Sequence, residues 1–295
     1  MTTGSLTHRA AGVLLGLACG DALGAHYEFG PALDPDTEVG MIGGGAFGWE
    51  PGEWTDDTQM ALVIAQAMAD GSDPLERSVL DRIAAGWFAW AGEARDVGAQ
   101  TRAVLASAGR MATAEARTGG GGGGGGGVRD GDGDGVGGTA HVQPPSAAHL
   151  SRAASALHAR TGHTAGNGSL MRTAPVALAY LDDESGLIEA ATTISSLTHA
   201  DPEAGEACVL WCLAIRHAIN TGALDLRQGL HCLSPERAEV WSARIDAAER
   251  SVPADFTSNG WVVQALQAAW SAIHRTHGEG AYAADHLRLA LAAAV

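Results

Sequence analysis

The chain has 295 residues, with 18 lysine and arginine residues against 34 aspartate and glutamate residues, a formal net charge of −16. Such an acidic protein repels nucleic-acid phosphates and anionic lipids, so we expect neither non-specific DNA or RNA binding nor docking on membranes. Hydrophobic residues make up 46% of the chain and aromatic residues 5%. Because alanine-rich apolar stretches with few β-branched residues favour helix over sheet, we expect an all-α fold.

Helical periodicity with start and stop signals predicts helices along most of the chain. The predicted ranges are 7–24, 58–69, 73–92, 101–116, 147–160, 169–180, 184–195, 203–220, 235–250, 261–275 and 281–295. Asp73 and Pro74 are a good N-cap and first-turn pair for the third of them. The apolar stretch in the first helix resembles a short signal peptide, but acidic residues follow at once without a cleavage site, so we interpret it as a buried helix.

Residues 117–146 interrupt this pattern, with nine consecutive glycines at 119–127. Since glycine loses the most entropy on ordering, we expect a disordered insertion within one domain that spans 1–295. Asp130 and the two aspartates that follow it resemble the start of an EF-hand loop. The twelfth position is His141 rather than the required glutamate, so calcium binding is not expected there.

Four cysteines, few and irregularly spaced, are typical of a reduced, cytoplasmic protein. Cys208 and Cys212 fit one face of a helix, and Cys232 alone does not complete a convincing zinc site with them. The preferred interpretation is that they are small buried hydrophobic residues. No run approaches the ~18 apolar residues that a membrane span needs.

Thr55, Asp56 and Asp57 stand directly before an apolar helix. Two adjacent carboxylates and a hydroxyl are hard oxygen ligands that suit Mg²⁺, Mn²⁺ or Ca²⁺. The alternative is simple helix capping, with Thr or Asp at the N-cap and acid in the first turn, and on this motif alone capping is the commoner explanation.

Four weaker motifs lie at the ends of different predicted helices. Glu28 stands just past the end of the first helix and is either functional or a solvated loop carboxylate. The segment 166–169, Gly-Asn-Gly-Ser, opens a helix whose free amides suit a phosphate, although Asn-Gly is equally an ordinary turn signal. His199 lies between two helices and either binds a ligand or caps and packs. Trp261 begins a late helix, and core packing explains it adequately.

Taken together and in this order, five segments of the chain resemble the ADP-ribosylglycohydrolase family, which includes ADP-ribosylarginine hydrolases. The segments are GDALGAHYEF, WTDDTQMAL, GNGSLMR with APVAL, LTHADP and NGWVVQAL. The resemblance covers about residues 14–266 outside the glycine-rich insertion. It implies a compact orthogonal bundle of helices around a central cleft that holds two metal ions, Mg²⁺ or Mn²⁺. It also implies hydrolysis of ADP-ribose from a modified protein side chain or another ADP-ribosylated acceptor.

The resemblance also assigns roles to residues. Thr55, Asp56 and Asp57 are similar to the family's metal ligands, and Asp56 and Glu28 to its catalytic residues, with Glu28 near the scissile bond. The implied substrate-binding residues are Asp96, Gly98, Asn167, Gly168, Ser169 and His199. Cleavage of the glycosidic bond builds oxocarbenium-like charge on the ribose, a metal lowers the pKa of bound water, and a carboxylate moves the proton.

The family supplies further metal ligands from an Asp-x-Asp-Thr motif after its final helix. Here residues 286–295 resemble that helix and no such motif follows, so we expect a truncated chain with a doubtful second metal position. Two alternatives to the hydrolase therefore stay open. One is a non-catalytic ADP-ribose-binding or structural homologue, and the other is a metal-dependent phosphoesterase that cuts the diphosphate.

Overall fold

The structure is a computed structural model that describes residues 3–31, 33–34, 37–119, 143–278 and 283–295. Its α-helices are α1 (Thr3–Gly24), α2 (Asp56–Ala67), α3 (Arg77–Ala91), α4 (Ala99–Gly119), α5 (Ala147–Thr161), α6 (Val176–Ala179), α7 (Glu184–Ser196), α8 (Pro202–Thr221), α9 (Pro235–Arg250), α10 (Val262–Thr276) and α11 (Ala283–Ala294). Short 3-10 helices are η1 (Asn167–Arg172), η2 (Leu226–Cys232) and η3 (Pro253–Asp255). Within these residues the extended backbone forms two isolated bridges and no strand, which confirms the all-α prediction.

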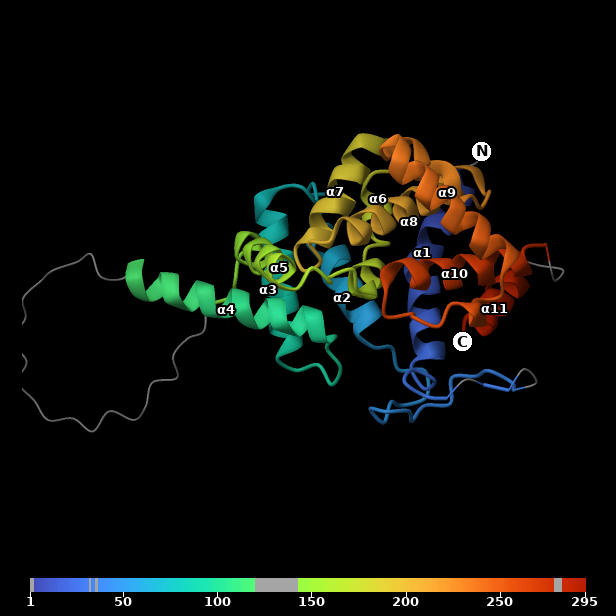
Figure 1. The fold of residues 1–295 in the computed structure, drawn as a ribbon, viewed down its shortest axis with the longest axis horizontal. Helices are drawn as coiled ribbons and strands as arrows, with labels where there is room; N and C mark the ends of the chain where they lie inside the picture. Colours follow the sequence, from blue (N-terminus) through green and yellow to red (C-terminus); the bar gives the residue numbers. More distant parts are fainter. Residues whose placement is uncertain (1–2, 32, 35–36, 120–142, 279–282) are drawn as a thin grey trace, which may run out of the picture.

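Helix α8 is the central element of the bundle. It packs against α1, α7, α10, η1 and η2 (Figure 1). Because neighbours surround it, it is apolar on more than one face, and Cys208, Leu210 and Cys212 on it are fully buried. This confirms the interpretation of Cys208 and Cys212 as small hydrophobic core residues, and both thiols are free.

Helices α2 and α3 join the bundle beside α1. The indole nitrogen of Trp87 on α3 donates to the Met60 carbonyl of α2 at 3.1 Å. Gly86 permits this close packing, since a Cβ there would lie 2.6 Å from Cγ1 of Val63. Both α1 and η1 contact α2, and in Figure 1 the first turn of α2 lies on the side of the molecule where α1 ends.

Two predicted helices differ from the structure. Helix α3 begins at Arg77 rather than at residue 73, because the Asp73 carboxylate accepts from the Leu75 amide in a turn instead of capping a helix. The predicted helix 169–180 is two short pieces, η1 and α6, separated at Pro175. Proline lacks an amide proton and disfavours helical backbone in the residue before it, which ends η1.

The predicted insertion 117–146 falls mostly outside the described residues, and so does the string from Asp130 to His141. Its edges are described: α4 continues to Gly119, and α5 begins at Ala147. None of the described helices combines the length and the hydropathy that a membrane span requires.

Candidate functional site

The first turn of α2 is fixed by Asp21, which lies near the end of α1. Thr55 occupies the N-cap position of α2 but makes no side-chain cap of its own. The Asp21 carboxylate instead accepts from the Thr55 amide at 2.9 Å, the Thr55 hydroxyl at 2.6 Å and the Thr58 amide at 2.9 Å. Asp21 thereby satisfies the free amides of α2 from another helix and holds Asp56 and Asp57 in the first turn.

Five carboxyl groups, Asp21 among them, share the space around this turn. Burial first, and then the negative charges of the neighbours, raise the pKa of Glu28 to about 7 and that of Asp56 to about 6. The same two causes hold the pKa of Asp57 well above its ordinary value. Burial also raises the pKa of Asp96, against the opposing charge of Arg102. Glu28 as a whole residue stays exposed, so solvent tempers the effect of burial on it.

This donor set fits a hard divalent cation by its chemistry. The Thr55 hydroxyl gives its proton to Asp21 and keeps its lone pairs free, as a neutral oxygen ligand must. Within the described part of the chain, no ion pair joins Glu28, Asp56 or Asp57 to a basic side chain. The carboxylates therefore repel one another until a cation or protons neutralise them.

The ligand atoms are not drawn together into a closed cage. Among the described residues, the one group of three acidic, histidine or cysteine ligand atoms within 4.8 Å of one another lies elsewhere, at Glu184, His231 and Cys232. At the first turn of α2 the carboxylates interact over longer distances, so a bound ion would have to draw them closer.

His199 is buried directly beneath the segment 166–169, Gly-Asn-Gly-Ser, which is called the glycine loop below. A Cβ at Gly168 would lie 3.2 Å from both Cε1 and Nε2 of the His199 ring, and one at Gly166 would lie 3.3 Å from Nε2. Both contacts are tighter than ordinary van der Waals contact, so the ring would have to shift by a few tenths of an ångström to admit a side chain. The Gln100 side chain, from the start of α4, donates at 3.0 Å to the carbonyls of Thr164, which lies just before the loop, and of Thr198, which precedes His199.

A chain of hydrogen bonds holds the His199 ring in place. Arg172 donates to the Thr198 hydroxyl oxygen at 2.6 Å, and that oxygen lies 2.7 Å from His199 Nδ1. A hydroxyl oxygen accepts two hydrogen bonds and donates one, so Thr198 pairs with Nδ1 in either ring tautomer while it accepts from Arg172. Burial, with the charge of Arg172, keeps the pKa of His199 well below its ordinary value, so the ring is neutral, and its Nε2 faces the glycine loop.

Arg172 links this group to the carboxylates. It is fully buried, its guanidinium lies 3.9 Å from the centre of the Trp87 ring, and burial lowers its pKa to about 9. The charges of Arg172 and Asp56 attract each other. The structure therefore brings Glu28, Asp56 and His199 into one region, with the buried guanidinium of Arg172 between the carboxylates and the histidine.

The remaining predicted residues lie around the glycine loop. Asn167 is held by its amide, which donates to the Gly260 carbonyl at 3.1 Å, and by its side chain, which donates to the Asn259 carbonyl at 3.0 Å. Ser169 is fully buried, and its hydroxyl lies 3.5 Å from Cys208 Sγ. Its side chain therefore faces the core, and the residue as a whole has no exposed surface. Gly98 is exposed in the loop before α4, with open space around its α-carbon.

The core-packing interpretation of Trp261 is wrong. The residue is 37% exposed, and its indole nitrogen donates to Glu203 at 3.1 Å. Its backbone forms an isolated bridge with Gly166. The motif that contains Trp261 therefore braces the glycine loop from the side of α10.

Three residues that organise the site were missed by the sequence analysis, namely Asp21, Arg172 and Thr198. All three stand inside the motifs that carried the family resemblance, so a signal was present. Their partners lie 26 to 37 residues away along the chain, as in the pairs Arg172–Thr198 and Asp21–Thr58, and only the packing of the helices reveals them.

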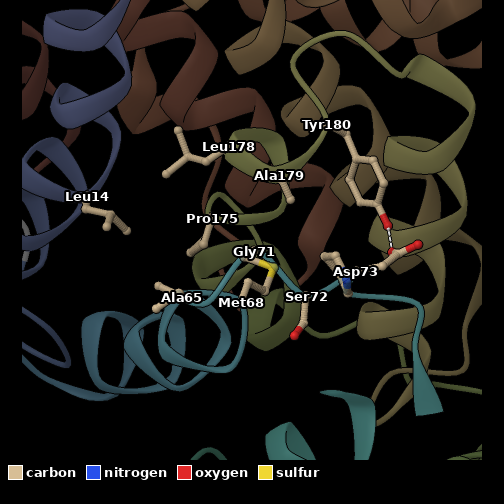
Figure 2. Close-up of a pocket in the computed structure, with 12 residues that line it drawn as sticks. Leu14, Ala65, Met68, Gly71, Ser72, Asp73, Pro175, Leu178, Ala179 and Tyr180 are labelled. Atoms are coloured by element: carbon tan, nitrogen blue, oxygen red, sulfur yellow. Dashed lines mark hydrogen bonds between the residues drawn. The ribbon is translucent and has the colours of Figure 1, made fainter. Parts of the chain in front are cut away.

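A cavity of about 590 Å³ lies at the opposite end of α2 and contains none of the predicted site residues. Figure 2 shows Met68, Pro175 and Leu178 along its wall, with the Tyr180 hydroxyl donating to Asp73 at one edge. Its wall is mainly apolar and carries no group of carboxylates, so it lacks the features of the site at the first turn of α2.

Comparison with known proteins places the chain in a family. The model of the family described as ADP-ribosylglycohydrolase matches residues 2–295. An ADP-ribosylarginine hydrolase Tri1 from Pseudomonas putida is 28% identical over 272 residues, which cover 90% of this chain and 61% of that protein. A Tri1 from Serratia proteamaculans is 25% identical over 273 residues, covering 91% and 63%.

Further matches agree. An ADP-ribosyl-[dinitrogen reductase] glycohydrolase from Rhodospirillum rubrum is 44% identical over 73 residues, covering 23% of this chain and 25% of that protein. A solved structure of an ADP-ribosylglycohydrolase-related protein complex superimposes with a TM-score of 0.57 at 25% identity, covering 98% of this chain and 82% of the other. The chain spans about three-fifths of the length of the two Tri1 proteins. It belongs to the ADP-ribosylglycohydrolase family.

Proposed function

We propose that the chain is a hydrolase that removes ADP-ribose from an ADP-ribosylated acceptor, with a modified arginine side chain as the first substrate to test. Two relatives are named ADP-ribosylarginine hydrolases, which motivates that choice. The observation that carries the proposal is the group of mutually repelling carboxyls, Glu28, Asp56, Asp57 and Asp96, around the first turn of α2.

Thr55, Asp56 and Asp57 would hold a divalent cation, Mg²⁺ or Mn²⁺. A second ion is implied only by the resemblance to the family. When bound, the cation supplies Lewis-acid chemistry and lowers the pKa of a coordinated water. Glu28 would move the proton as a general acid or base. In the metal-free protein burial raises the pKa of Glu28, and a bound cation would act in the opposite direction by neutralising the neighbouring carboxylates. The carboxylates also favour the positive charge that develops on the ribose as the glycosidic bond breaks.

The glycine loop would receive the ADP-ribose. Gly168 would bring backbone close to the ligand, Asn167 lies at the edge of the loop, and Nε2 of His199 faces the same loop. The expected α-helix start is absent because η1 is a short 3-10 helix. Support for diphosphate binding therefore comes from the loop amides and the buried charge of Arg172. Asp96 and Gly98 would line the distal-ribose side.

Two variants test the assignment with a mono-ADP-ribosylated arginine peptide and Mn²⁺. Asp56→Ala should abolish metal-dependent release of ADP-ribose while the helical circular dichroism is retained, because the residue lies at a helix start. Glu28→Gln should keep ADP-ribose affinity and lose about 10²-fold in rate, as expected for a lost general acid or base. The exposed Glu50→Gln is a matched control and should behave as wild type.

Undiminished turnover in Asp56→Ala would contradict the metal assignment. An equal fall of binding and rate in Glu28→Gln would make that residue structural. Release of AMP instead of ADP-ribose would mean that the diphosphate is cut, as in a phosphoesterase.

A second candidate function is ADP-ribose binding without catalysis. The wide spacing of the carboxylates at the first turn of α2 favours this alternative. Among the described residues of that site, no three ligand atoms lie within 4.8 Å of one another. This alternative predicts ADP-ribose binding that persists in a chelator and no turnover with any divalent ion, whereas the hydrolase predicts that both need the cation.

A further inference from the structure

A second group of metal-ligating side chains lies where η2 ends against the first turn of α7. Glu184 Oε1 lies 2.8 Å from His231 Nε2, and that nitrogen lies 3.2 Å from Cys232 Sγ. One ligand atom from each residue lies within 4.8 Å of the other two. None of these residues belongs to the site at α2.

The spacing suits a tetrahedral zinc ion. Zinc binds imidazole nitrogen and carboxylate oxygen at about 2.0 Å and thiolate sulfur at about 2.3 Å, which sets the N–O and N–S separations near 3.3 and 3.6 Å. The present separations of 2.8 and 3.2 Å need to open by only about half an ångström to admit the ion. The His231 side chain is 61% exposed, so it is free to make this adjustment and an ion can reach it from solvent.

The carboxylate is already oriented for this role. Arg216 Nη1 donates to Glu184 Oε2 at 2.9 Å, and Arg216 Nε is itself anchored on the Leu181 carbonyl at 3.0 Å. This arrangement occupies one oxygen of Glu184 and leaves Oε1 toward His231. Outer hydrogen bonds that orient a ligand in this way are a regular feature of zinc sites.

We propose that Glu184, His231 and Cys232 bind one Zn²⁺ ion, with solvent in the remaining position. Imidazole and thiolate are ligands that select zinc over the magnesium or manganese expected at α2. Zinc binds the thiolate form of cysteine, so the Cys232 thiol proton passes to solvent as the Zn–S bond forms. The ion would join the start of α7 to the end of η2, 47 residues apart in the chain.

Cobalt titration of the full, metal-stripped chain in excess Mg²⁺ tests this site. Co²⁺ replaces Zn²⁺ in such sites and gives a thiolate-to-cobalt charge-transfer band that oxygen ligands cannot produce. We expect this band to saturate at one equivalent and to vanish when Zn²⁺ is added. Cys232→Ser should abolish it, and His231→Ala should weaken cobalt affinity at least tenfold.

Cys19→Ser is the matched control, because Cys19 is an exposed thiol on α1, and it should leave the band unchanged. No band at tenfold excess of Co²⁺, a band that persists in Cys232→Ser, or saturation at half an equivalent through two chains would each overturn the proposal. Because the readout is spectroscopic and Mg²⁺ fills the other site, loss of hydrolase activity would not affect this result.

Discussion

Replacing Asp21 with alanine tests how the first turn of α2 is held. The substitution removes the acceptor of three hydrogen bonds, from the Thr55 amide, the Thr55 hydroxyl and the Thr58 amide. Thr55 and Thr58 are each 3% exposed, so water cannot easily replace the lost acceptor. The same substitution also removes a negative charge that raises the pKa values of Glu28 and Asp57.

These two effects oppose each other in the free energy of unfolding. Three hydrogen bonds to a charged acceptor, at about 1.5 kcal/mol each, contribute about 4.5 kcal/mol. Relief of the repulsion between Asp21 and the neighbouring carboxyls, which are partly solvated, returns about 1.5 kcal/mol. The hydrogen bonds dominate, and Asp21→Ala should lose about 3 kcal/mol, or about 6–12 °C in Tm.

Thermal unfolding followed by circular dichroism in a chelator measures this loss, and Asp182→Ala, at an exposed aspartate, is the control. A fall in Tm of less than 2 °C would show that Asp21 does not hold the turn. A rise in Tm would show that repulsion between the carboxyls is the larger effect and would refute the reasoning.

Two further predictions concern protons and packing. Because the folded-state pKa values of Glu28, about 7, and of Asp57 lie above those of the unfolded chain, the metal-free protein should lose stability as pH rises from 6.5 to 8. His199 is buried and neutral, so its protonation lowers the stability of the folded protein only below about pH 6.5, outside this window. A Tm that rises with pH between 6.5 and 8 would contradict the raised pKa values of Glu28 and Asp57. Gly168→Ala should weaken ADP-ribose binding about tenfold by displacing the His199 ring. The control is Gly12→Ala, at an exposed glycine of α1 with open space around it, which should bind as wild type. Calorimetry compares the two variants, and equal affinities would show that the His199 ring does not support ligand binding.

Most helices could be predicted because their apolar periodicity and capping residues are local. Helices α5, α7, α8 and α9 lie within a residue or so of their predicted ranges. The failures have local causes too. Asp73 is a turn residue whose carboxylate also meets the Tyr180 hydroxyl, and Pro175 interrupts a stretch whose apolar pattern continues through it.

The site was only partly predictable. Thr55 and Asp56 can be recognised in the sequence because a hydroxyl and adjacent carboxylates stand directly before an apolar helix. Asp21 looks like an ordinary helix residue, and its role exists only because α1 packs on α2. Likewise, no local pattern shows that Arg172 would reach Thr198 and, through its hydroxyl, hold the His199 ring. Long-range partners of this kind depend on tertiary packing, which sequence periodicity does not encode.

The central claim is that the carboxylates at the first turn of α2 hold a divalent cation that ADP-ribose binding requires. The most direct measurement is calorimetric titration of Mn²⁺ into the 295-residue chain, followed by ADP-ribose, for the wild type and Asp56→Ala. The account predicts stoichiometric Mn²⁺ binding and Mn²⁺-dependent ADP-ribose binding in the wild type, and loss of both in Asp56→Ala. No Mn²⁺ binding by the wild type, or undiminished binding by Asp56→Ala, would contradict it.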